Sequence, residues 1–367
     1  MFSSSTVTET ALLAALQTVL DPQTGRDFVS TRQVRDLRIQ GSSVSLEVQM
    51  NYPARSLWPN LEAMLSAAAR TVPGVSEVTV RFSTAIVAHA VQRGVQLLPG
   101  VKNLIAVASG KGGVGKSTTA VNLALALAAE GAKVGMLDAD IYGPSQPTML
   151  GIDGRPDSAD GKTMAPMIGH GLQVMSIGFL VDADQAMVWR GPMVTQALEQ
   201  LLRQTNWKDL DYLIVDMPPG TGDIQLTLAQ RVPVTGAVIV TTPQDIALID
   251  AKKGLKMFEK VSVPILGIVE NMAVYCCPNC GHTEHIFGAD GGKAMAEQYG
   301  VDYLGALPLE RSIREQTDAG RPTVVFDPEG TLAGLYKEVA RKVAIKIAHQ
   351  AKDYSAKFPT ITVSKGT

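Results

Sequence analysis

The glycine-rich segment at residues 110–118, GKGGVGKST, has the composition of a phosphate-binding loop. It lies between an apolar run, LIAVAS, and a helix-like segment, TAVNLALALAAE. Glycines in such a loop let backbone N–H groups surround phosphate oxygens, and the following helix presents its positive end. Strand, glycine loop and helix form the context that a P-loop requires. The sequence therefore predicts an ATP site formed by Gly110, Lys111, Gly112, Gly113, Val114, Gly115, Lys116, Ser117 and Thr118.

Two lysines and a serine of this loop have distinct expected roles. Lys116 is expected to meet the β and γ phosphates, and Ser117 to place its hydroxyl on Mg²⁺. Lys111 is a second lysine in the loop, which resembles the deviant Walker A class of ATPases. That resemblance implies that Lys111 reaches across a dimer interface to the partner's nucleotide, and hence that the active form is a dimer.

Acidic residues follow two further apolar runs, at the sheet edge where parallel strands present their carboxyl ends to ligand. Asp138 and Asp140 occur in GMLDADIYGPS, and Asp216 and Asp223 in YLIVDMPPGTGD. In the deviant class the first pair contacts Mg²⁺ and the attacking water, and Asp140 is our preferred water-positioning residue. Asp216 is the expected Walker B carboxylate and a magnesium ligand with Ser117. The resemblance places a first switch at Asp138 and Asp140, and a second switch at the Pro-Pro-Gly turn with Asp223.

One asparagine follows a late apolar run. Asn271 ends PILGIVEN and resembles the asparagine that reads the adenine ring in these ATPases. A capping or turn asparagine is the alternative interpretation.

The three cysteines, Cys276, Cys277 and Cys280, lie within five consecutive positions. Such crowding excludes a disulfide framework. The C-x-x-C turn of Cys277 and Cys280 points two sulfurs at one metal, and thiolates favour Zn²⁺ or an iron–sulfur cluster. The chain has no second C-x-x-C motif, so one chain cannot close a four-cysteine site. His282 and His285 offer an alternative zinc site.

The pattern around these motifs predicts the elements that position them. Short apolar runs separated by helix-length segments predict an α/β domain with a doubly wound, mostly parallel sheet. We expect this P-loop ATPase and cluster-carrier domain over residues 102–351, and a small α+β domain over residues 1–85 in front of it. Residues 86–101 read as a linker and residues 352–367 as a flexible tail.

Composition limits the class of protein. The 367 residues are 46% hydrophobic and 19% charged, which excludes intrinsic disorder as the default. A net charge of −2 provides no global field for nucleic acid. No apolar run reaches the roughly 20 residues needed to span a bilayer, and the first residues lack the basic region of a secretory signal. We therefore expect a cytoplasmic protein without nucleic-acid or membrane partners.

The motifs as a set resemble those of the Mrp/ApbC iron–sulfur cluster carrier ATPases. They are GKGGVGKST, LDADIYGPS, WRGPM, DMPPGTGD, TTPQDIALIDAKKG, GIVENM and CPNCGH, in that order, between about Lys102 and Pro322. The resemblance implies binding of a [4Fe-4S] cluster at Cys277 and Cys280, linked to ATP hydrolysis. It also implies transfer of that cluster to apo iron–sulfur proteins, with a cluster-assembly scaffold as a further partner. Because a [4Fe-4S] cluster ordinarily takes four thiolates, we expect a homodimer bridged by one cluster.

The N-terminal segment resembles the MIP18-type (DUF59) module. The resemblance rests on VLDPQTGRDFVS, VSLEVQM and VPGVSEVTV. Members of that module often have a cysteine near the proline after the middle strand, where this chain has Tyr52 and Pro53. This copy therefore cannot ligate iron through sulfur, which leaves a docking or regulatory role or an inert structural domain.

Two rival functions share the deviant loop. A ParA/MinD-like positioning ATPase could use the basic segment KEVARKVAIKIAHQAK on anionic lipid. Its residues Val339, Val343 and Ile347 have helical spacing, however, and predict docking on the domain instead. A reductase of the nitrogenase iron-protein kind places its cysteines far apart in sequence, unlike this chain.

Overall fold

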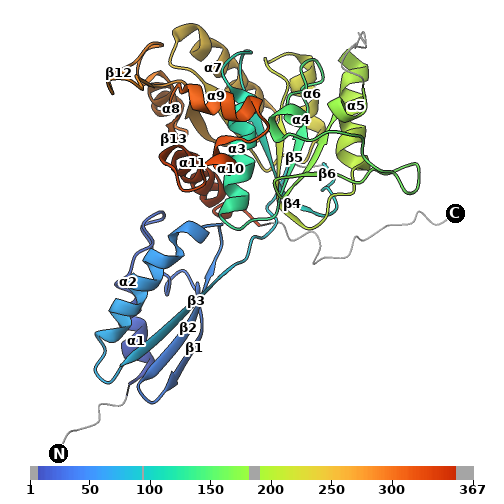
Figure 1. Cartoon of the computed structure of the whole chain (residues 1–367). Coiled ribbons are helices and arrows are strands. Elements are labelled where there is room, and N and C mark those ends of the chain that lie inside the picture. The colour runs from blue at the N-terminus through green and yellow to red at the C-terminus, as the bar shows by residue number, and fades with distance from the viewer. Residues whose placement is uncertain (1–6, 93–94, 182–190, 353–367) are drawn as a thin grey trace, which may run out of the picture.

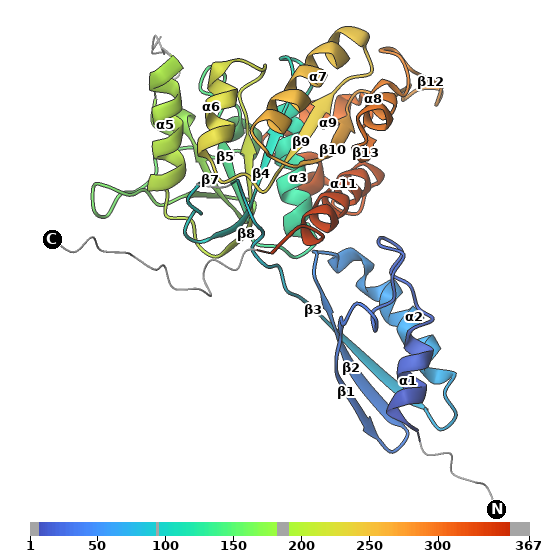
Figure 2. The same cartoon turned by 180° about the vertical axis from the view of Figure 1, so that it is seen from behind.

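The computed structural model describes residues 7–92, 95–181 and 191–352 and places them in two units (Figure 1). A small α+β unit comes first, and a larger α/β unit follows after the segment at residues 85–100. Figure 2 shows the same arrangement from behind. The predicted fold class is confirmed. The predicted tail falls outside the described residues apart from Lys352, which pairs with His89 in an isolated β-bridge.

The small unit packs two helices on a three-stranded sheet of order β1-β2-β3. Strands β2 and β3 are parallel, and β1 is antiparallel to β2. Alternate residues of β2 are buried, as the sequence pattern predicts. The elements are α1 (Glu9–Leu16), β1 (Val34–Gln40), β2 (Ser43–Met50), the 3-10 helix η1 (Arg55–Leu57), α2 (Trp58–Arg70) and β3 (Glu77–Thr84).

Strand β1 is an element that the sequence pattern did not predict. Its sequence, VRDLRIQ, has three charged residues and no fully buried position. Asp36 has a left-handed backbone (φ +46°), and the register with β2 shifts between Arg35 and Arg38. This irregularity breaks the period-two alternation by which a strand is recognised, and charged, bulged strands are typical of sheet edges.

The large unit contains a sheet of eight strands in the order β13-β10-β9-β4-β8-β5-β7-β6. All neighbouring pairs are parallel except β6 with β7. The strands are β4 (Val101–Ala108), β5 (Val134–Asp138), β6 (Met167–Gly169), β7 (Leu172–Ser176), β8 (Leu210–Asp216), β9 (Gly236–Thr241), β10 (Ile265–Glu270) and β13 (Tyr303–Ala306). A two-stranded hairpin, β11 (Tyr275–Cys276) and β12 (Thr283–Glu284), lies outside this sheet.

Helices cover both faces of the large sheet, as a doubly wound fold requires (Figures 1 and 2). Helices α3 and α11 pack together on one face, and α5, α6, α7 and α8 follow one another across the other. The helices are α3 (Lys116–Ala129), α4 (Gln146–Leu150), the 3-10 helix η2 (Ile177–Phe179), α5 (Gly191–Gln204), α6 (Asp223–Arg231), α7 (Asp245–Lys260), α8 (Gly291–Tyr299), α9 (Arg311–Asp318), α10 (Thr323–Phe326) and α11 (Thr331–Ala348). None of the described helices is long and apolar enough to cross a membrane.

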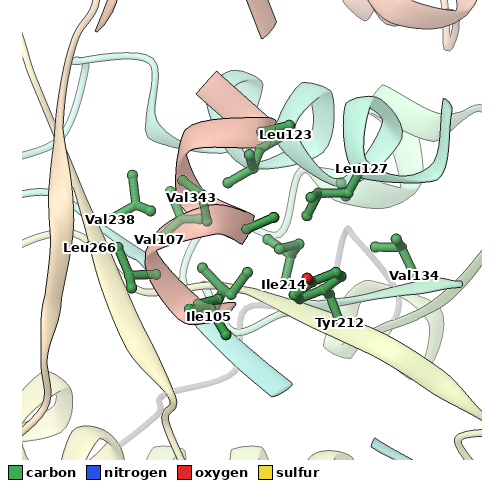
Figure 3. Close-up of a cluster of buried hydrophobic side chains, with 14 of the residues drawn as sticks. Ile105, Val107, Leu123, Leu127, Val134, Tyr212, Ile214, Val238, Leu266 and Val343 are labelled. Atoms are coloured by element: carbon green, nitrogen blue, oxygen red, sulfur yellow. The ribbon is translucent and has the colours of Figure 1, made fainter. Parts of the chain in front are cut away.

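The main core lies between the sheet and the pair α3–α11 (Figure 3). Ile105 of β4 and Ile214 of β8 meet Leu123 of α3 and Val343 of α11, and all four side chains are buried. Val339 and Ile347 are buried as well, so the apolar face of α11 docks on the domain as its spacing predicts. This packing fixes α3, and with it the loop that precedes α3.

The two units meet at the carboxyl end of α3. Glu130, which caps that end and is fully buried, accepts hydrogen bonds from the backbone N–H and the hydroxyl of Ser56 at 2.9 and 2.6 Å. Arg341 of α11 donates to the same carboxylate at 2.5 Å, and the Arg55 N–H donates to the Glu130 carbonyl at 3.1 Å. One buried carboxylate therefore joins the small unit to two helices of the large one.

Candidate nucleotide and cluster site

The glycine loop has the shape that the sequence predicts, and its glycines are required for two different reasons. Gly113 and Gly115 have left-handed backbones with φ of +80° and +77°, which side chains rarely adopt. A Cβ on Gly110 would lie 2.0 Å from the Asp250 carbonyl carbon of α7. A Cβ on Gly115 would lie 2.1 Å from Nδ2 of Asn271. The loop is thus held between α7 and the end of β10.

Lys116, the first residue of α3, lies among carboxylates. Its side chain is only 6% exposed and pairs with Asp216, the last residue of β8. Asp140 lies 3.9 Å from the same ammonium, and the Ser117 hydroxyl accepts from it at 3.2 Å. The structure therefore brings together four residues that the sequence places in three separate motifs.

Asp138, the last residue of β5, is buried, and its carboxylate accepts hydrogen bonds from nearby backbone and side-chain donors. Its carboxylate accepts from the backbone N–H groups of Asp140, Ser145 and Gln146 at 3.2, 3.0 and 3.1 Å. The Ser176 hydroxyl donates a fourth bond at 3.0 Å. Burial, and then the negative charge of Asp216, raise the pKa of Asp138 to about 7. In this geometry Asp138 holds the loop that carries Asp140.

Asp140 is more accessible than Asp138. Burial raises its pKa, while the neighbouring Lys116 acts in the opposite direction. A carboxylate beside the P-loop lysine, with its backbone fixed through Asp138, is well placed to orient a water molecule. The DMPPG turn approaches the same region, because the Gly220 N–H donates to the Ser109 carbonyl at 3.0 Å. Asp223 begins α6 just after this turn.

Gln146 is a site residue that the sequence analysis missed. It is fully buried, and its amide donates to Asp216 at 2.9 Å and to the Ser117 carbonyl at 3.2 Å. Its Oε1 is buried without a hydrogen-bond partner. An unpaired oxygen beside Ser117 and Asp216 fits a hydrated Mg²⁺, because metal-bound water is a hydrogen-bond donor. The signal available in the sequence was only a glutamine close behind the Asp138–Asp140 motif.

Lys111 and Asn271 differ in their contacts with the rest of the site. The Lys111 ammonium forms no ion pair with any residue in the described ranges. Asn271 is buried, and its Nδ2 donates to the Val114 carbonyl at 2.9 Å. The asparagine thus contacts the P-loop backbone directly, and a base-reading role would use its remaining polar atom.

The cysteines lie on the β11–β12 hairpin, which leaves the end of β10 just beyond Asn271. The Gly281 N–H donates to the Cys277 carbonyl at 2.9 Å and closes the C-x-x-C turn. All three thiols are free, and Cys280 is exposed. Hydrogen bonds from the backbone N–H groups of Asn279 and Cys280 lower the pKa of Cys277, which favours its thiolate.

The histidines near this turn are arranged differently from what a compact zinc site needs. Nδ1 of His285 bonds the Ala273 carbonyl at 2.7 Å, and His282 is exposed. Over residues 7–92, 95–181 and 191–352, no group of three or more histidine, cysteine, aspartate or glutamate side chains is arranged to hold a metal ion. The hairpin therefore presents the two thiols of the C-x-x-C turn without a set of further metal ligands from the part of the chain that the structure describes.

Comparison with known proteins assigns each of the two units to a family. Residues 100–344 match the family described as NUBPL iron-transfer P-loop NTPase, and residues 9–80 match the family described as iron–sulfur cluster assembly protein. The chain is 53% identical over 332 residues to the iron–sulfur cluster carrier protein of Escherichia coli (strain K12), covering 90% of each chain.

A eukaryotic relative and a solved structure agree with this. The iron–sulfur cluster transfer protein NUBPL of Mus musculus is 54% identical over 252 residues, which cover 68% of this chain and 79% of that protein. A nucleotide-binding protein from Archaeoglobus fulgidus in complex with ADP is 38% identical, with a TM-score of 0.54. That match covers 60% of this chain and 88% of the other. The resemblance predicted from the motifs is confirmed, and the chain belongs to the family of iron-transfer P-loop NTPases that includes NUBPL.

Proposed function

We propose that this protein binds and hydrolyses ATP at the P-loop and carries a [4Fe-4S] cluster on Cys277 and Cys280 to apo iron–sulfur proteins. The observation that carries the proposal is the direct attachment of the two sites. Asn271 bonds the P-loop at Val114, and the free C-x-x-C turn begins six residues later at Cys277. The similarity to an iron–sulfur cluster carrier protein and an iron–sulfur cluster transfer protein supports the same function.

The P-loop residues take their roles from their positions. Backbone N–H groups of residues 110–118 surround the phosphates, and Lys116 turns from Asp216 to the β and γ phosphates. Asp216 and Ser117 would then hold Mg²⁺, and the unpaired Oε1 of Gln146 would support the hydrated ion as a hydrogen-bond acceptor. Bound Mg²⁺ supplies positive charge that offsets the charge developing on the phosphates. Asp140 orients the attacking water, and positioning and electrostatics provide most of the rate enhancement.

One ligand count and one unpaired lysine support a homodimer. One chain offers two thiolates in ligand spacing, whereas a [4Fe-4S] cluster ordinarily takes four, so two hairpins share one cluster on a two-fold axis. Lys111, unpaired among the described residues, acts on the partner's nucleotide. Tyr142 and Ile246 are 62% and 67% exposed and follow β5 and β9 at the nucleotide edge, where such a dimer would cover them.

The cellular setting is inferred from the cargo. Three free cysteines and an oxygen-sensitive cluster suit a reducing compartment, which we propose is the cytoplasm. The proposed partners are a cluster-assembly scaffold that loads the hairpin and apoproteins that receive the cluster.

Anaerobic reconstitution with iron and sulfide tests the cluster proposal. The expected result is broad absorption near 400 nm and about four irons per dimer. Cys277→Ala and Cys280→Ala should abolish the cluster while ATP binding persists. Cys276→Ala is the matched control and should retain most of the cluster, because Cys276 lies outside the ligand pair.

The dimer is measured in the same preparations by sedimentation. Cluster loading should promote dimerisation, because the free energy of metal binding becomes free energy of assembly. A full cluster on isolated monomers would refute the bridging proposal. Zinc without iron after anaerobic reconstitution would instead favour a zinc-binding P-loop ATPase.

A further inference from the structure

A cavity distant from the P-loop in the fold lies where the small unit meets the end of α11. Its volume is about 190 Å³, roughly six times the share of one water molecule in the liquid. It is lined by residues around β1 and β2, by the segment after β3 and by the end of the described chain. Arg32, Arg35 and Lys352 line it, and no aspartate or glutamate does.

These three cations have no anionic partner within the described ranges. The ion pair on β1, the strand that contains Arg35, joins other residues, Arg38 and Asp36. Three like charges around one small cavity repel one another, and an anion in the cavity would relieve that repulsion. The charges therefore indicate the sign of a ligand.

His89 supplies an independent observation at the same cavity. It lines the cavity, is only 2% exposed, and its Nε2 is buried without a hydrogen-bond partner. A buried polar atom without a partner calls for an explanation, because nearly all such atoms in folded proteins are paired. The protonation of the ring decides whether Nε2 donates or accepts a hydrogen bond. If Nε2 is unprotonated, an oxyanion without a proton would not satisfy it, because both would be acceptors.

The hydrogen bonds around Asn103 assign the proton on that ring. Nδ2 of Asn103 donates to the carbonyls of Val87 at 2.9 Å and Asp211 at 3.3 Å, so its Oδ1 faces His89. That oxygen lies 3.0 Å from Nδ1 of His89, which is therefore the protonated nitrogen. Burial lowers the pKa of His89 and keeps the ring neutral. Nε2 is left as an acceptor that lacks a donor.

We propose that this cavity binds a small phosphate-class oxyanion that carries a hydroxyl group. The P–OH group donates to Nε2 of His89, and the charged oxygens accept from Arg32, Arg35 and Lys352. Inorganic phosphate and a phosphate monoester share this chemistry. Because both units line the cavity, a bound anion would also fasten the small unit to the end of α11.

Calorimetric titration of the full-length chain at pH 6 with inorganic phosphate, glycerol phosphate and sulfate tests this proposal, because about half of a phosphate monoester keeps its P–OH at that pH. Sulfate has the size and charge of phosphate but no proton to donate, so we expect it to bind at least tenfold more weakly. Binding of inorganic phosphate alone would assign the free ion, and equal or tighter binding of glycerol phosphate would assign a monoester. No preference for phosphate over sulfate would overturn the proposal.

Variants separate this cavity from the P-loop, which also binds phosphate but is the same in all of them. The exposed pair Arg32→Gln with Arg35→Gln should weaken phosphate binding at least tenfold, whereas Arg38→Gln, on the same strand and paired with Asp36, should change it less than twofold. His89→Gln should abolish the preference for phosphate over sulfate, because an amide can donate to either ion. Unchanged phosphate affinity in the double arginine variant would contradict the site even if His89→Gln fails to fold.

Discussion

The two ends of helix α3 carry opposite buried charges, and each is at the end of the helix that the backbone dipole disfavours. Lys116 lies at the positive amino end, and Glu130 caps the negative carboxyl end about 21 Å away. The surroundings must therefore compensate both charges. They do so differently: Glu130 is satisfied by Ser56 and Arg341, whereas Lys116 faces Asp140, Asp216 and an unpaired oxygen of Gln146.

This difference separates a structural charge from one that awaits a ligand. At the carboxyl end both oxygens of the Glu130 carboxylate have donors, and the buried atom without a partner is a donor, Nε of Arg341. At the amino end, Asp140 and Asp216 face the single ammonium of Lys116, so the carboxylates outnumber the cation and a further cation can bind. Helix α3 thus joins a site that can take up and release a ligand to a junction whose carboxylate is already paired within the protein.

The largest effect is expected at the amino end. Lys116→Ala should leave a folded protein whose ATPase rate falls at least about a thousandfold, because the phosphates lose their principal cation in a site that works by electrostatics. The measurement is steady-state phosphate release. Lys133→Ala, an exposed lysine paired with Asp209, is the control and should keep the wild-type rate. A Lys116→Ala protein with wild-type turnover would refute the assigned site.

At the carboxyl end the effect should appear in stability instead. Glu130→Ala should lower the free energy of unfolding by about 3 kcal/mol, because Arg341 is left buried without its partner. Denaturant unfolding monitored by circular dichroism measures it. Glu259→Ala removes one member of the exposed pair with Lys256 and should cost less than about 1 kcal/mol. Equal losses in the two variants would show that the junction is no stronger than a surface pair.

A mixing experiment sharpens the assignment at the amino end. Lys111→Ala and Asp140→Ala should each lose ATPase activity alone, yet mixtures of the two should recover part of it. In a heterodimer one of the two composite sites contains both intact residues if Lys111 acts on its partner's nucleotide. Activity is measured across a range of mixing ratios. The absence of rescue at every ratio would place Lys111 in its own chain's site.

The smallest effect concerns pH. The pKa of Asp138 is raised to about 7, so between the unfolded pKa and pH 7 the folded state binds one proton more than the unfolded state. Stability must then fall as pH rises through that window, by about 1.4 kcal/mol per pH unit at most. Asp138→Asn should flatten this slope in urea unfolding between pH 5 and 7. An unchanged slope would assign the proton to another group.

The sequence predicted the elements that follow a strict local pattern and missed those that depend on distant partners. The continuous apolar runs of β4, β5, β8, β9 and β10 are buried strands, as expected. Strand β1 was missed because its charges and its bulge at Asp36 hide the alternation.

The same limit applies to the site. The glycine loop could be read because its chemistry is contiguous, whereas Gln146 reaches Asp216 across 70 positions. The junction of Glu130 joins Ser56 and Arg341 across 74 and 211 positions. Periodicity and motif spacing describe neighbours along the chain, and no such pattern reports a single pair of side chains so far apart.

The contacts between the P-loop and later parts of the chain bear on the order of folding during synthesis. The loop rests on the backbone of Asp250, and Val114 is bonded by Asn271, which the ribosome adds 157 residues later. The small unit, complete by Thr84, is free to fold as it emerges, whereas the loop lacks its supports until β10 has been synthesised. ATP can therefore not assist early folding of the nascent chain. The P-loop becomes able to bind ATP only at about the time when the hairpin with the cysteines is synthesised.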